Sequence, residues 1–126
     1  MLFLRFKSPG TTSVIGPAES VELRGAAIFL GEGAEPVARF EGGAWALDGK
    51  RCPYVECRSM LSIQFEDPTG RIGTVIGLRT AFYLRGAYAF AGRERIAKLN
   101  PLAGMWLETG TQSQWPWIRV RAAQHG

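Results

Sequence analysis

The residues best suited to chemistry in this chain lie near its C-terminal end, where tryptophan and arginine occupy alternate positions. One face of an extended strand would carry Trp115, Trp117, Arg119 and Arg121. Aromatic rings beside arginines are the groups with which proteins hold single-stranded nucleic acid, because bases stack on the rings and phosphates pair with the guanidinium groups. The first strand has a similar set, Phe3, Arg5 and Lys7, which would enlarge this face if the two terminal strands pair.

The same tryptophans fit two other roles. They could pack into the domain while the arginines stay in solvent, and Pro116 is typical of an edge strand in that arrangement. Tryptophan is also a common anchor for a protein partner, including a second copy of the chain, so a homodimer is a separate hypothesis.

A second group of aromatic residues could line a small-molecule site inside a β-barrel. Its members would include Tyr83 and Tyr88, the two ligand-binding candidates, together with Trp45, Phe82 and Trp106. The alternative is a packed core in which these rings only fill space.

Residues for catalysis or metal binding are few. The carboxylates that could do acid–base chemistry fall on outward faces or at turns, where they are expected to be solvated charges: Glu41, Asp48, Glu56, Glu66 and Asp67. Cys52 and Cys57 are expected to point to opposite faces, and His125 lies in a terminal tail. We therefore expect no catalytic residue, no metal site and no cofactor, although a small enzyme that uses carboxylate or tyrosine groups in a pocket stays an alternative.

The elements that would position these residues are predicted to be β-strands. The clearest is Tyr54–Glu66, which alternates apolar and polar side chains over its whole length. Gly42-Gly43 predicts a hairpin, and Gly25-Ala26-Ala27 predicts a bulge or a close crossing of another backbone. Two more strands are expected over 71–78 and 81–90, with Tyr88 on the same side as Phe82. The prediction is one all-β domain, 1–126: an antiparallel small barrel or sandwich with at most one short helix, over 93–99. The alternative is an α+β roll.

Composition adds only broad limits. The chain has 126 residues and a formal charge of +4, and of its 15 basic residues only Lys7, Lys50 and Lys98 are lysine. An arginine-rich surface is compatible with an anionic partner, but the basic residues are spread along the whole sequence. No apolar run is long enough to span a membrane as a helix, and we expect a cytoplasmic protein that does not bind membranes. The expected function is a non-catalytic binding or interaction module.

Overall fold

The structure is a computed structural model and describes residues 1–123. Its strands are β1 (Leu2–Ser8), β2 (Thr11–Ala18), β3 (Ser20–Arg24), β4 (Ala27–Leu30), β5 (Ala38–Glu41), β6 (Ala44–Leu47), β7 (Lys50–Cys52), β8 (Tyr54–Glu66), β9 (Ile72–Arg85), β10 (Tyr88–Ala91), β11 (Glu94–Asn100), β12 (Met105–Glu108), β13 (Gln114–Trp115) and β14 (Trp117–Ala122). Residues 1–123 contain no helix, so the all-β prediction is confirmed and the α+β alternative is wrong. Accordingly, nothing in that range is a helix long and apolar enough to cross a lipid bilayer.

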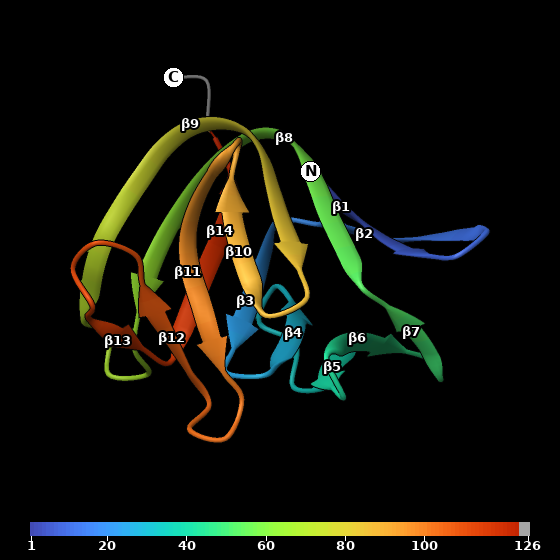
Figure 1. Ribbon diagram of the computed structural model, residues 1–126. Helices are drawn as coiled ribbons and strands as arrows, with labels where there is room; N and C mark the ends of the chain where they lie inside the picture. The colour runs from blue at the N-terminus through green and yellow to red at the C-terminus, as the bar shows by residue number, and fades with distance from the viewer. Residues whose placement is uncertain (124–126) are drawn as a thin grey trace.

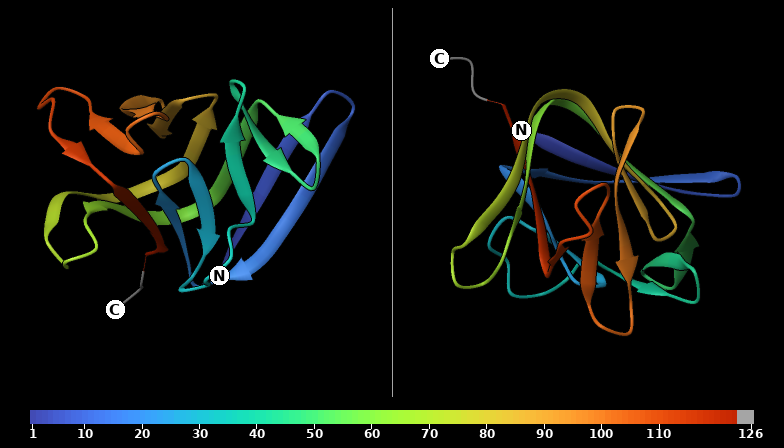
Figure 2. Two further views of the ribbon diagram at one scale, coloured as in Figure 1. Left: turned by 90° about the horizontal axis from the view of Figure 1, so that it is seen from below. Right: turned by 60° about the vertical axis from the view of Figure 1, so that its left-hand side comes forward.

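All strands belong to one antiparallel sheet. Its order is β13-β12-β11-β10-β9-β8-β14-β3-β4-β5-β6-β7, and β1 joins it through β8. The two long strands, β8 and β9, arch across the molecule, while the β1–β2 hairpin extends away from the rest (Figure 1). The same arrangement is visible from two further directions (Figure 2). β1 and β14 lie one after the other along a single edge of β8, so the two terminal strands do not pair with each other and the condition for enlarging the Trp/Arg face is not met.

The sheet folds back on itself, and its two halves meet through side chains. Trp45 of β6 stacks on Trp106 of β12, with ring centroids 6.5 Å apart and planes 6° from parallel. Each indole is buried and donates one hydrogen bond, Trp45 to the carbonyl of Gly86 and Trp106 to the carbonyl of Gly25, both at 3.0 Å. At Gly25-Ala26 the structure has a two-residue turn that reverses β3 into β4, since Arg24 pairs with Ala27, so the bulge expected inside one extended segment is wrong. Another backbone does approach closely there, because a Cβ at Gly25 would lie 3.0 Å from the Gly104 carbonyl oxygen.

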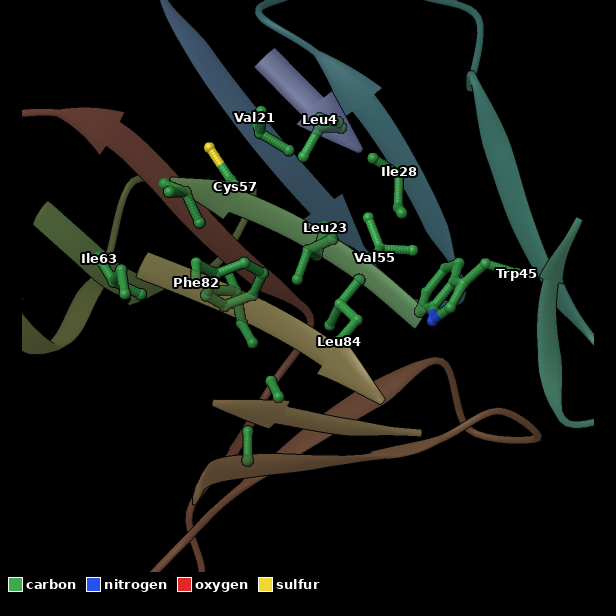
Figure 3. Close-up of a cluster of buried hydrophobic side chains, with 14 of the residues drawn as sticks. Leu4, Val21, Leu23, Ile28, Trp45, Val55, Cys57, Ile63, Phe82 and Leu84 are labelled. Carbon is green, nitrogen blue, oxygen red and sulfur yellow. The ribbon is translucent and has the colours of Figure 1, made fainter. Parts of the chain in front are cut away.

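The core is built as alternation predicts. The inward residues of β8 are all buried: Val55, Cys57, Leu61, Ile63 and Phe65. Apolar side chains from β3, β4, β6, β8 and β9 converge between the two halves of the sheet (Figure 3). Cys52 and Cys57 are both buried, and no disulfide joins them. They do not point to opposite faces as expected, because Pro53 separates β7 from β8 and restarts the alternation.

One strand boundary differs from the sequence prediction and changes which residues reach the surface. β9 is continuous from Ile72 to Arg85, and a two-residue turn at Gly86-Ala87 then reverses the chain into β10. Gly86 has a φ of +54°, a conformation that such turns require and that glycine adopts without strain. Arg85 therefore pairs directly with Tyr88 and shares its face, so the expected common side for Tyr88 and Phe82 is wrong.

Candidate functional site: a basic–aromatic sheet face

The outer surface of β1, β8, β9, β10 and β11 carries two rows of cross-strand partners. The first row is Lys7, Tyr54, Arg85, Tyr88 and Lys98. The second row is Arg5, Glu56, Tyr83, Phe90 and Arg95. Directly paired residues point to the same side of a sheet, so both rows lie on one face. We call these residues, with Arg58 two positions after Glu56 on β8, the basic–aromatic face.

Cations lie over the aromatic rings of this face. Lys7 Nζ is 5.3 Å from the centroid of the Tyr54 ring, and the guanidinium of Arg58 is 5.5 Å from that of Tyr83. Arg95 and Lys98 lie over Tyr88 at 5.2 and 5.5 Å. Such contacts hold flexible cationic side chains near the surface of the sheet.

The rings themselves are half-buried and are anchored by the sheet. Those of Tyr54 and Tyr83 lie 5.7 Å apart. Burial raises the pKa of Tyr54 above its ordinary value of 10.0, so its phenol is neutral at neutral pH and does not repel an anion.

Few of the cations on this face are neutralised. Lys7 Nζ lies 3.2 Å from Glu56 Oε1, and Arg58 Nε lies 3.4 Å from Glu56 Oε2. Within residues 1–123 no acidic side chain forms an ion pair with Arg5, Arg85, Arg95 or Lys98. The face therefore combines fixed aromatic surface with a net positive charge.

The strand that the sequence singled out, β14, has a different character. Arg119 Nη2 lies 2.6 Å from Glu22 Oε1 and 2.7 Å from Glu66 Oε1, and both carboxylates are buried. Arg24 Nε also donates to Glu22, and Gln64 donates to Glu66. We call this group (Glu22, Arg24, Gln64, Glu66 and Arg119) the Arg119 cluster. The two carboxylates and the two guanidinium groups of this cluster balance each other's charge, so Arg119 has a structural role.

Trp117 and Arg121 share one face of β14 with Arg119 and line a common groove of about 340 Å³, whereas Trp115 lies apart from them. Trp115 belongs to β13, pairs with Trp106, and is only 7% exposed, with the guanidinium of Arg71 4.6 Å from its ring centroid. Trp117 is half-buried and has Arg24 over its ring at 5.2 Å. Arg121 alone is exposed. Pro116 divides the run, and the four side chains do not form one open surface.

The internal-cavity candidates also separate. Trp45, Phe82 and Trp106 are buried in the core, whereas Tyr83 and Tyr88 lie outside on the basic–aromatic face. The structure brings these two tyrosines together with Tyr54 and Phe90, which sequence reasoning did not select. The alternation Tyr83-x-Arg85 was a usable signal for an outward aromatic and basic face. It assigns Tyr88 and Phe90 to that face only when the turn at Gly86 is recognised.

Two carboxylates expected to be solvated are buried. Glu56 is 4% exposed and Glu66 is 6% exposed, because long cationic neighbours cover them. Asp67 lies at a turn, where the hydroxyl and N–H of Thr69 donate to it, and these hydrogen bonds lower the pKa of Asp67. No three His, Cys, Asp or Glu side chains among residues 1–123 gather where they could hold a metal ion, and His125 lies outside the described residues. No protein-family model, curated protein or solved structure matches this chain.

Proposed function

We propose that this protein is a non-catalytic binding module that holds single-stranded nucleic acid on its basic–aromatic face. The observation that carries the proposal is the alternation of half-buried rings and unneutralised cations along paired strands. Unstacked bases have π-faces that can lie on tyrosine rings or on guanidinium planes, and their phosphates can pair with Arg85, Arg95 and Lys98. A duplex keeps its bases stacked inside, so this face favours a single strand.

The dimensions agree with this proposal. The first row crosses four strand-to-strand intervals, and at about 4.8 Å per interval it extends roughly 19 Å. A groove of about 310 Å³ between Tyr54, Tyr83, Arg85 and Phe90 lies near its centre. Such a platform is long enough for a few nucleotides of an extended strand.

The Trp/Arg strand supports binding less well than this face. Arg119 would have to leave two buried carboxylates before it could pair with a phosphate, and that exchange is unfavourable. A protein partner and a homodimer stay predictions; sedimentation at several concentrations tests the second, since a homodimer requires a mass that rises with concentration.

Fluorescence anisotropy of a labelled twelve-nucleotide oligo(dT) tests the proposal. If about four phosphates are contacted, log K should fall with log[salt] with a slope of about −3, so affinity drops roughly 50-fold between 50 and 200 mM salt. Tyr88→Ala should weaken binding about tenfold, because one stacking surface is lost. Lys98→Ala should reduce the magnitude of the slope by about 0.7.

Matched controls come from the other strand. Arg121→Ala removes one exposed cation, as Lys98→Ala does, but outside the face. Trp117→Ala likewise removes a half-buried ring of β14. Both controls should change affinity by less than about twofold. Absent or salt-insensitive binding, or equal losses in Lys98→Ala and Arg121→Ala, contradicts the proposal.

A further inference from the structure

Glu56 has a buried oxygen that accepts no hydrogen bond. The residue is 4% exposed, and its Oε1 lies 3.2 Å from Lys7 Nζ. Its Oε2 is buried and accepts no hydrogen bond from residues 1–123, although Arg58 Nε is 3.4 Å away. An unsatisfied buried acceptor is unfavourable, so a ligand that donates to it gains affinity.

A groove lies directly beside this carboxylate. It has a volume of about 580 Å³ and is lined by Phe3, Arg5, Val14, Glu56 and Arg58. Its apolar walls are open to solvent, since Phe3 is 46% and Val14 51% exposed. Arg5 pairs with Glu56 and Glu56 with Tyr83, so the groove continues the second row of the basic–aromatic face.

We infer that this groove selects a guanine base of the bound strand. A carboxylate only accepts hydrogen bonds, and guanine presents two adjacent donors, N1–H and the N2 amino group, on its Watson–Crick edge. Uracil and thymine flank their single N3–H with carbonyl oxygens, which repel a carboxylate. Cytosine and adenine place a ring-nitrogen acceptor beside the amino group. Guanine is therefore the base whose edge best fits Glu56.

The surrounding side chains fit the same ligand. The ring of Phe3 supplies an apolar surface on which a base can stack, and Arg5 adds a cation for the adjoining phosphate. Arg58 covers Oε2 but is 63% exposed along its side chain, so it can turn outward as the base enters. This inference rests on the proposed function, because it identifies a base within the same bound strand.

The first experiment uses the wild-type protein. Anisotropy is measured with oligo(dT) carrying one central substitution: guanine, inosine, adenine or cytosine. Guanine should bind about tenfold more tightly than thymine, the range expected for one specific base-edge contact. Inosine lacks the N2 amino group and should lose about half of that gain on a logarithmic scale. Equal affinity for guanine and inosine, or for guanine and thymine, overturns the inference while the proposed function stands.

The second experiment changes the acceptor. Glu56→Gln should abolish the preference for guanine, because an amide presents both a donor and an acceptor, and binding to oligo(dT) should become tighter, because a negative charge is removed from the binding face. Glu66→Gln, which alters a buried carboxylate of the Arg119 cluster, should keep the preference. A guanine preference that survives Glu56→Gln overturns the inference. Failure of every oligonucleotide to bind the wild type instead refutes the proposed function.

Discussion

Replacing Arg119 by methionine tests whether the Arg119 cluster has a structural role. Breaking a buried ion pair by removing one partner costs about 3–5 kcal/mol, because the remaining charge is left desolvated. Here Glu22 keeps Arg24 at 2.7 Å and Glu66 keeps its hydrogen bond from Gln64, and the Arg119 side chain is 21% exposed, so water can enter. We therefore expect a loss near the lower limit, about 3 kcal/mol in the free energy of unfolding.

Urea denaturation followed by tryptophan fluorescence measures this loss. At an m-value of about 2 kcal/mol per M, the midpoint of Arg119→Met should fall by about 1.5 M. Arg121→Met, two residues along the same strand and exposed, should shift stability by less than about 0.5 kcal/mol.

The double variant Arg119→Met, Glu66→Gln should recover at least about 1 kcal/mol relative to Arg119→Met, because Glu22 keeps its ion pair with Arg24 and no buried carboxylate is left unpaired. The reasoning is refuted if Arg119→Met costs less than about 1 kcal/mol, or if the double variant is no more stable than the single one.

Two further predictions concern the core. A Cβ at Gly73 would lie 2.3 Å from the Trp115 ring, so Gly73→Ala should lower the free energy of unfolding by about 1–3 kcal/mol in the same urea assay. Gly77→Ala on the same strand is the control and should cost much less, because a Cβ there would meet no atom within 4 Å. Equal effects of the two substitutions would contradict the packing argument. Burial raises the pKa of Cys57 from 9.0 to about 11, so the native protein should resist dithiobis(nitrobenzoate) at about pH 8 until urea unfolds it. The folded state disfavours the thiolate, so the free energy of unfolding should decline as the pH rises from 9 toward 11, where the unfolded chain loses the proton more readily than the folded one. Cys57→Ala should reduce that decline.

Alternation within a strand was a reliable guide to the core. Leu2, Leu4 and Phe6, which alternate with Phe3, Arg5 and Lys7 in β1, are buried, and so are Ile118 and Val120, which alternate with Arg119 and Arg121 in β14. The period of two is a local property of an extended chain, so it is readable from a few neighbouring residues. The Gly42-Gly43 hairpin was predictable for the same reason, since two glycines in sequence specify a tight turn.

Turns with weaker signals were where sequence reasoning failed. Arg85-Gly86-Ala87-Tyr88 contains one glycine inside an alternating run, and it can be taken for a continuous strand. A two-residue reversal there moves Tyr88 and Phe90 from the inner face to the outer one, and it leaves Ala89 inside. Missing this one turn therefore placed Tyr88 and Phe90 on the inner face, although they belong to the candidate site, and placed Ala89 outside, although it belongs to the core.

The candidate site depends on strand register as well as on alternation. Tyr54, Arg85, Tyr88 and Lys98 share a row because β8, β9, β10 and β11 are consecutive hairpins whose turns set the register, whereas Lys7 joins the row only through the pairing of β1 with β8, which are distant in sequence. The same holds for charge. Arg119 and Arg95 are indistinguishable by composition, yet buried carboxylates of β3 and β8 neutralise Arg119, while Arg95 has no such partner among residues 1–123. The positions of the buried glutamates therefore decide which arginines hold the sheet together and which are left to bind an anionic ligand.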